Sequence, residues 1–79
     1  MRIETIKCIK KTNDTKNENT YMIRKTTSKE AETNWYQDEL CFVRDVSNTQ
    51  VKIFRPFDGK EYMLSEQETN NFIVVGVNI

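Results

Sequence analysis

Residues 40–77 read LCFVRDVSNTQVKIFRPFDGKEYMLSEQETNNFIVVGV, and they contain four short apolar runs at nearly even spacing. The runs are residues 40–43, 51–54, 62–64 and 72–77. Polar segments rich in Ser, Asn, Asp, Pro and Gly separate the runs, and these residue types are typical of turns between antiparallel strands. We therefore expect the second half of the chain to fold as a small antiparallel β meander.

The connection between the second and third runs contains Pro56, Phe57, Asp58 and Gly59. Pro presets φ and Gly tolerates positive φ, so we expect residues 54–60 to form a hairpin connection. Phe57 is an exception to the polar character of turns. An apolar side chain at such a position either folds back over the sheet or contacts a partner.

The first part of the chain is more polar than the rest. Residues 1–11 contain three isoleucines whose spacing fits neither a strand nor a helix cleanly. Their β-branched content favours an edge strand with a bulge, and a short helix is the alternative. Residues 12–19 have no apolar side chain and predict a loop, whereas residues 20–25 alternate, with Tyr21 and Ile23 on one face, and predict a strand. We expect the two strands to pair as a long hairpin.

The segment that precedes residue 40 leaves two structures open. Thr27 and Glu30 have the spacing of a helix capping box, and Ala31 and Trp35 follow at i,i+4 spacing. This pattern predicts one or two turns of helix, with Trp35 over one end of the sheet. The alternative is a long loop from which Trp35 and the tyrosine after it project.

Ser65 and Glu68 form a second capping box, in a stretch long enough for one helical or 3-10 turn. The predicted order is strand, loop, strand, loop or short helix, three close strands, one helical turn and a last strand. This order resembles the SH3-like small β-barrels, in which a 3-10 turn commonly precedes the final strand. The resemblance covers residues 20–77 and implies a mainly β fold, a five- to six-stranded antiparallel barrel or curved meander with a short helical turn. No ALYDY-type motif is present, so binding of proline-rich peptides is not implied.

Length and composition predict one small β domain, residues 1–79, with 37% hydrophobic and 30% charged residues. The chain has no run of about 18 apolar residues and no charged-then-apolar leader, so we expect a cytoplasmic protein with no membrane partner. Cys8 and Cys41 lack CxxC spacing, and we expect both to be buried thiols outside any disulfide. A disulfide between them is the alternative, and it requires an oxidising compartment.

The absence of histidine removes the commonest general base and the commonest metal ligand. The two isolated cysteines are the remaining candidates for a nucleophile. No DxDxDG loop is present for calcium. The sequence therefore predicts no enzyme, no cofactor and no metal site.

Three aromatic residues are the candidate contacts for a partner protein, and they are Trp35, Tyr36 and Phe57. Large amphipathic side chains in polar segments are common interface anchors. Trp35 has an alternative role, because a small core needs its largest side chain. We expect a small non-enzymatic protein-binding module, an adaptor or an inhibitor of a host protein, and an unpaired strand edge predicts a homodimer as well. The richness in Lys, Asn, Ile and Thr resembles proteins of low-GC bacteria and their phages.

Binding of nucleic acid is the alternative function. Residues 1–29 carry eight Lys or Arg against three Asp or Glu, whereas residues 30–79 carry four against nine. Pairing of the first two strands would produce a cationic strip with a stacking platform, formed by Lys7, Lys10, Lys11, Lys16, Tyr21, Arg24, Lys25 and Lys29. The zero net charge and the pI near 6.2 argue against a protein dedicated to nucleic acid.

Overall fold

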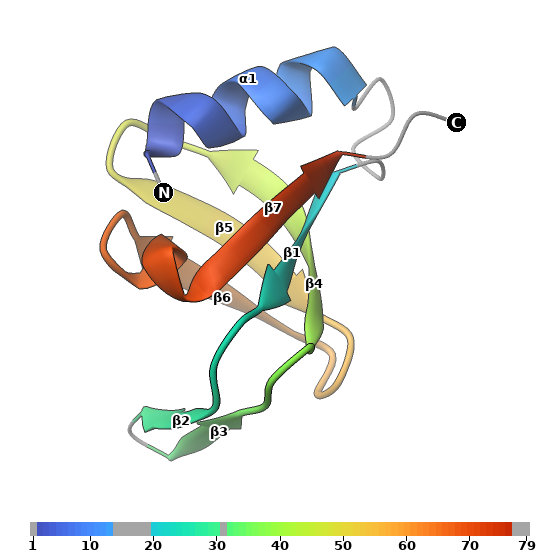
Figure 1. The fold of residues 1–79 in the computed structure, drawn as a ribbon, viewed down its shortest axis with the longest axis vertical. Helices are drawn as coiled ribbons and strands as arrows, with labels where there is room; N and C mark the ends of the chain where they lie inside the picture. Colours follow the sequence, from blue (N-terminus) through green and yellow to red (C-terminus); the bar gives the residue numbers. More distant parts are fainter. Residues whose placement is uncertain (1, 14–19, 31, 77–79) are drawn as a thin grey trace.

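The computed structural model describes residues 2–13, 20–30 and 32–76. In chain order the elements are α1 (Ile3–Asn13), β1 (Thr20–Arg24), β2 (Ser28–Glu30), β3 (Thr33–Trp35), β4 (Leu40–Val46), β5 (Gln50–Arg55), β6 (Lys60–Ser65), the 3-10 turn η1 (Glu68–Asn71) and β7 (Phe72–Gly76). One antiparallel sheet has the order β6-β5-β4-β1-β7, and β2 pairs with β3 in a separate hairpin (Figure 1). The predicted mainly β fold with a short helical turn is confirmed.

The four apolar runs of the second half correspond to β4, β5, β6 and β7. The first three pair in sequence as a meander, whereas β7 crosses over and pairs with β1. As a result β1 is a central strand, with β4 on one side and β7 on the other. Alternate residues of β5, namely Val51, Ile53 and Arg55, are buried on one face of the sheet. The register shifts in β4 between Val43 and Asp45, so the alternation is interrupted there.

Both turn signals of the second half have the predicted structure. Gly59 adopts a φ of 69°, and its N–H donates a 2.8 Å hydrogen bond to the carbonyl of Arg55. In the Ser65–Glu68 box, the Ser65 N–H donates to Glu68 Oε1 and the Glu68 N–H donates to Ser65 Oγ, both at 3.2 Å. The turn η1 begins at Glu68 and leads directly into β7. Hydrogen bonds between residues close in sequence therefore determine where β6 begins, after Gly59, and where it ends, at Ser65.

The strand predicted for residues 1–11 is wrong, because Ile3–Asn13 form helix α1. Ile3 and Ile6 lie one helical turn apart and are buried, and Ile9 packs against the same core. The step of three between these isoleucines therefore matches one face of a helix. An acidic residue in the first turn and two lysines in the last turn complement the helix dipole.

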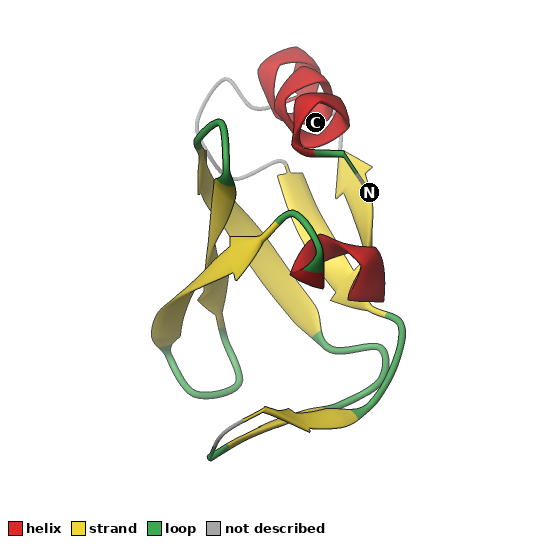
Figure 2. Ribbon diagram, turned by 90° about the vertical axis from the view of Figure 1, so that its left-hand side faces the viewer, coloured by secondary structure: helices red, strands yellow, loops and turns green. Residues whose placement is uncertain are grey.

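Helix α1 lies across one end of the sheet (Figures 1 and 2). The Ile3 N–H donates to Glu66 Oε2 at 3.1 Å, and Lys7 Nζ donates to Asn48 Oδ1 at 2.7 Å. The long hairpin predicted for the first 25 residues is therefore absent, and the helix covers the core instead. Of the loop predicted at residues 12–19, residues 14–19 lie outside the described chain. No helix in the described ranges has both the length and the apolar character needed to cross a membrane.

The segment before β4 is neither the predicted helix nor a long loop, because it forms the β2–β3 hairpin. The Glu30 carboxylate does not cap a helix. It accepts hydrogen bonds from Arg24 Nη2 at 3.1 Å and from Ser28 Oγ at 3.2 Å. Trp35, at the end of β3, turns its side chain into the core. Contacts with β1 thus override the local helical pattern.

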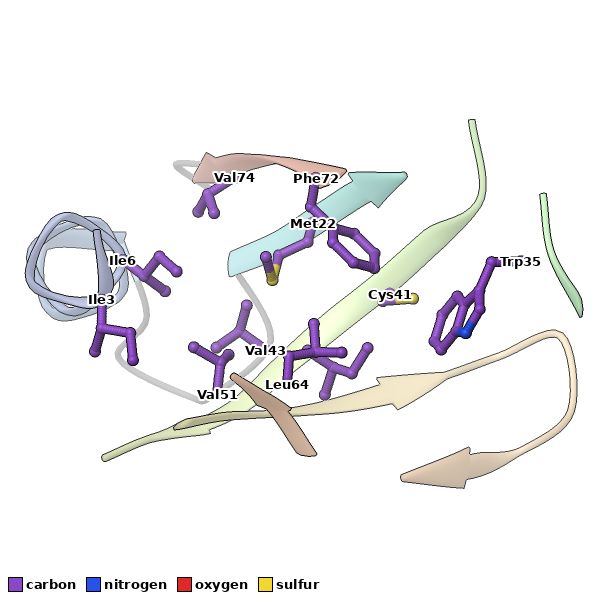
Figure 3. Close-up of a cluster of buried hydrophobic side chains, with 11 residues drawn as sticks. Ile3, Ile6, Met22, Trp35, Cys41, Val43, Val51, Leu64, Phe72 and Val74 are labelled. Carbon is purple, nitrogen blue, oxygen red and sulfur yellow. The ribbon is translucent and has the colours of Figure 1, made fainter. Parts of the chain in front are cut away.

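The core lies between the inner face of the sheet, α1 and the β2–β3 hairpin. Figure 3 shows Ile3 and Ile6 entering from α1 at one end and Trp35 closing the other. Its buried apolar residues are Ile3, Ile6, Met22, Trp35, Cys41, Val43, Val51, Ile53, Leu64, Phe72 and Val74. Cys41 is buried as predicted, but the predicted burial of Cys8 is wrong, since it faces solvent, and neither cysteine is in a disulfide.

We expect Ile6→Ala to lower the free energy of unfolding by about 2–4 kcal/mol, because it removes a fully buried side chain between α1 and the sheet. Cys8→Ala is the matched control on the exposed side of the same helix, and it should change that free energy by less than about 0.5 kcal/mol. Urea denaturation measures both values. If Ile6→Ala lowered the free energy of unfolding as little as Cys8→Ala does, the result would contradict the packing of α1 on the core.

Candidate functional site

Tyr36 and Phe57 form an exposed aromatic pair at the end of the sheet away from α1. Tyr36 follows β3 and Phe57 lies in the turn between β5 and β6. Their ring centroids are 5.4 Å apart with an angle of 58° between the planes. Tyr36 remains 46% exposed and Phe57 68% exposed. The structure therefore brings together two of the three predicted partner-binding residues and leaves both accessible.

Trp35, the third predicted contact residue, belongs to the core. Its side chain is only 3% exposed, and its ring packs edge-on against Tyr62 at 5.2 Å and Phe72 at 5.9 Å between centroids. A partner cannot reach the indole without displacing these neighbours. Trp35 thus takes the alternative role given by the sequence, as the largest side chain of the core.

Arg55 links the core to the exposed pair. Its guanidinium carbon lies 4.4 Å from the Trp35 ring centroid and 4.9 Å from that of Phe57. The buried guanidinium donates to both carboxylate oxygens of Glu39, at 3.0 Å for Oε2, to Asp58 Oδ2 at 3.3 Å, and to one backbone carbonyl of β3. One side chain therefore fastens β3, the β3–β4 turn and the β5–β6 turn to one another.

Arg24 also lies against the ring of Trp35. Its guanidinium carbon lies 5.3 Å from the Trp35 centroid and 5.0 Å from that of Phe72. It pairs with the Glu30 carboxylate at 3.1 Å, and its Nε donates to the carbonyl of Thr26 at 2.9 Å. These rings and guanidinium groups form a continuous set of contacts that we call the aromatic–arginine ladder: Phe72, Arg24, Trp35, Arg55, Phe57 and Tyr36.

The charges around the ladder stabilise its ionised groups. Burial lowers the pKa of Arg55, but its hydrogen bonds with Glu39 and Tyr62 and the nearby carboxylates outweigh burial and raise that pKa above its ordinary value. Burial raises the pKa of Asp58, but hydrogen bonds from Tyr62 and from the Lys60 N–H, together with the charge of Arg55, lower it overall. Both groups are therefore charged at neutral pH, and the turn that carries Phe57 is held by ionic hydrogen bonds.

The residues predicted to bind nucleic acid do not form one strip. Lys7, Lys10 and Lys11 lie on α1, whereas Lys25 and Lys29 lie at or beside the β2–β3 hairpin, at the opposite end of the molecule (Figure 1). Three members of the set are elsewhere: Tyr21 is on the outer face of the sheet, Arg24 is buried in the ladder, and Lys16 lies outside the described residues. The predicted pairing that would have aligned them is absent, because α1 takes the place of the first strand.

Cys41, one of the two candidate nucleophiles of the sequence, is buried. Burial raises the pKa of the Cys41 thiol to about 12, and the neighbouring Glu39 acts in the same direction. This cysteine is therefore protonated at neutral pH, which makes it a poor nucleophile. Within the described ranges no three His, Cys, Asp or Glu side chains form a group that could hold a metal ion.

Sequence reasoning missed Arg55 and Glu39 and assigned Arg24 to a different site. A signal was present, because each arginine continues the alternation of buried residues along its strand: Arg24 follows Met22 by two positions, and Arg55 follows Ile53 by two. Two arginines at inward positions of strands predict a buried ionic network.

Comparison with models of protein families, with curated proteins and with solved structures found no match to this chain.

At pH 8 a thiol reagent should modify Cys8 quickly and Cys41 only after unfolding, because Cys41 is buried with a pKa of about 12. The absorbance of the released reagent should show one rapidly reacting thiol per native chain and two per chain in denaturant. Cys8→Ser should remove the rapidly reacting thiol of the native protein. Two rapidly reacting thiols in the native protein would contradict the burial of Cys41.

The raised pKa of Cys41 also makes the stability of the fold depend on pH. The thiol of the unfolded chain ionises above about pH 8.5, while the folded one stays protonated. The free energy of unfolding is therefore unaffected by this group below that pH and falls as the pH rises further.

Arg55→Met should lower the free energy of unfolding by about 3–5 kcal/mol, because it leaves the Glu39 carboxylate without its cation. Lys52→Met is the matched control, since it breaks a partly exposed pair with Glu61, 3.5 Å apart, and should cost less than about 1 kcal/mol. Urea denaturation at neutral pH measures both changes. A loss for Arg55→Met as small as the control value would show that the ladder is not a buried ionic network.

Proposed function

We propose that this chain is a small non-enzymatic protein-binding module that contacts its partner through Tyr36 and Phe57. The observation that carries this proposal is that the two rings contact each other at a tilted angle and still expose about half of the first and two thirds of the second. Exposed aromatic side chains near one another are typical of the residues that supply most of the binding energy of an interface.

The pair is held in place before any partner binds. Phe57 rests on the guanidinium of Arg55, which Glu39 and Asp58 fix through hydrogen bonds. Asp58 Oδ1 also accepts the N–H of Lys60 at 3.0 Å, which stiffens the turn itself. A contact surface that is already ordered loses less conformational entropy on binding than a mobile loop does. The ladder thus supports a function in binding rather than a purely structural one.

The chemistry of the partner follows from the charges beside the pair. Asp38 lies two residues after Tyr36 and is exposed, and Asp58 directly follows Phe57. The proposed partner therefore presents an apolar side chain flanked by Lys or Arg. The composition supports a source in low-GC bacteria or their phages, and an adaptor or an inhibitor of a host protein fits this surface.

The cysteines and the sheet order bear on the location of the protein and on its fold family. Thiols that form no disulfide are typical of a reducing compartment, which supports a cytoplasmic location. The sheet order and the turn η1 directly before β7 support the SH3-like resemblance expected from the sequence. A likeness of fold alone does not determine function, so the exposed pair, and not the resemblance, is the basis of the proposed function.

The double variant Tyr36→Ala, Phe57→Ala should reduce recovery of the partner from host lysate at least about tenfold, because it removes both aromatic anchors. Met63→Ala is the matched control, an exposed apolar residue on β6 away from the pair, and it should retain recovery. Affinity capture with tagged protein, with and without nuclease, read by mass spectrometry, measures the effect. Urea denaturation should show that all variants stay folded.

Three results of this experiment would contradict the proposal. One is recovery that is equal for the double variant and the wild type. Another is recovery lost equally in the double variant and in Met63→Ala, which would point to a surface other than the pair. The last is capture that disappears on nuclease treatment, which would favour the nucleic-acid function.

A further inference from the structure

The face of the large sheet that points away from the core carries two rows of apolar side chains. The first row crosses β7, β1 and β4 as Ile73, Ile23 and Leu40, which are paired across the strands. The second crosses β7, β1, β4 and β5 as Val75, Tyr21, Phe42 and Phe54. We call these seven residues the outer rows. None of them belongs to the buried core.

The outer rows are accessible to solvent. Ile73 is 44% exposed and Leu40 38% exposed, and the other five are each partly exposed. The two described elements outside the sheet that contribute to the core, α1 and the β2–β3 hairpin, place Ile3, Ile6 and Trp35 against the inner face. An antiparallel sheet with one solvated face normally has polar residues on that face. Seven adjoining apolar residues there indicate a surface that another molecule covers.

We propose that the outer rows are the interface of a homodimer, in which the sheets of two copies pack face to face. Such an interface is related by a twofold axis, so the same patch must fit itself. Rows of apolar side chains can pack against the same rows of a second copy without needing opposite charges to face each other. Twisted sheets pack in this way with their strands about 30° apart and about 10 Å between the sheets.

The charges on this face favour a second copy over a strongly acidic or basic partner. The second row continues across β6 to Glu61, which pairs with Phe54, so one acidic residue lies at its end. Charged side chains of both signs lie beside the rows: Arg44 stacks on Phe42 and Phe54, and Lys52 pairs with Glu61 at 3.5 Å. The chain as a whole has zero net charge, so two copies do not repel each other. Because neither positive nor negative charge dominates on this face, the face does not select a strongly charged partner.

The size of the face fits a reversible dimer. With strands about 4.8 Å apart and a rise of about 3.3 Å per residue, the four strands that carry the rows present an area of roughly 20 Å by 17 Å. Two such faces cover roughly 700 Å² in total, less than the roughly 1,000 Å² expected of a stable specific interface, so the dimer belongs to the weak, transient class. The dissociation constant should therefore lie in the micromolar range. This route differs from the pairing of strand edges expected from the sequence, because it uses the face of the sheet.

Sedimentation velocity of the full chain from about 5 to 500 μM tests the proposal across the expected range of dissociation constants. The wild type should shift from the mass of one chain to that of two as concentration rises. Ile73→Lys should raise the dissociation constant at least about 30-fold, because it places a charge in the first row. Leu40→Lys, in the same row on a different strand, should do the same. Both sites are exposed in one copy, so circular dichroism should show folded variants.

Phe57→Lys is the matched control, since it adds the same charge at an exposed apolar site outside the rows. It should keep the wild-type dissociation constant for the dimer while it loses capture of the partner protein. The two proposals can therefore fail separately. A wild type that stays monomeric throughout would overturn the dimer and leave the rows to a different partner protein. Equal weakening of the dimer by Ile73→Lys and Phe57→Lys would overturn it as well.

Discussion

The burial of two arginines beside one tryptophan is the constraint on which the rest of the structure depends. Arg24 and Arg55 both lie against the ring of Trp35, and each pairs with a carboxylate. A buried guanidinium without partners is strongly unfavourable, so these contacts determine where the surrounding turns lie. Arg24 holds the β2–β3 hairpin to β1, and Arg55 holds the β5–β6 turn to the β3–β4 turn. The exposed pair Tyr36 and Phe57 owes its position to these ties.

The two ends of the inner sheet face are closed by different physical means. At one end α1 inserts Ile3 and Ile6, and the contact is apolar. At the other end the ladder combines ring packing with ionic hydrogen bonds. The charged groups of this network lie around the Trp35 ring, which closes the apolar core at this end. That network also keeps a charged, ordered surface next to the aromatic pair.

The sequence predicts those parts of the fold that short-range chemistry determines. The strands β4 to β6, the turn at Gly59 and the box of Ser65 and Glu68 all follow from residues within a few positions of one another. The spacing of the isoleucines in residues 1–11 leaves a strand and a helix open, and burial of Ile6 against the sheet accompanies the helix. The β2–β3 hairpin depends on a more distant contact, that of Glu30 with Arg24. For the same reason Tyr36 and Phe57 could be named as exposed candidates, whereas Arg55, which holds Phe57 in place, could not.

The apolar runs that identify the strands also carry information about both faces of the sheet. A strand with one solvated face alternates apolar and polar residues, whereas a strand covered on both faces is nearly continuous in its apolar character. In β1 and β7 the outward positions are apolar, as in Tyr21, Ile23 and Ile73, and in β4 Leu40 and Phe42 are apolar before the chain reaches Arg44. Among residues 2–13, 20–30 and 32–76, α1 and the β2–β3 hairpin add their buried apolar side chains to the inner face. This pattern is the physical basis for proposing that the outer rows form an interface.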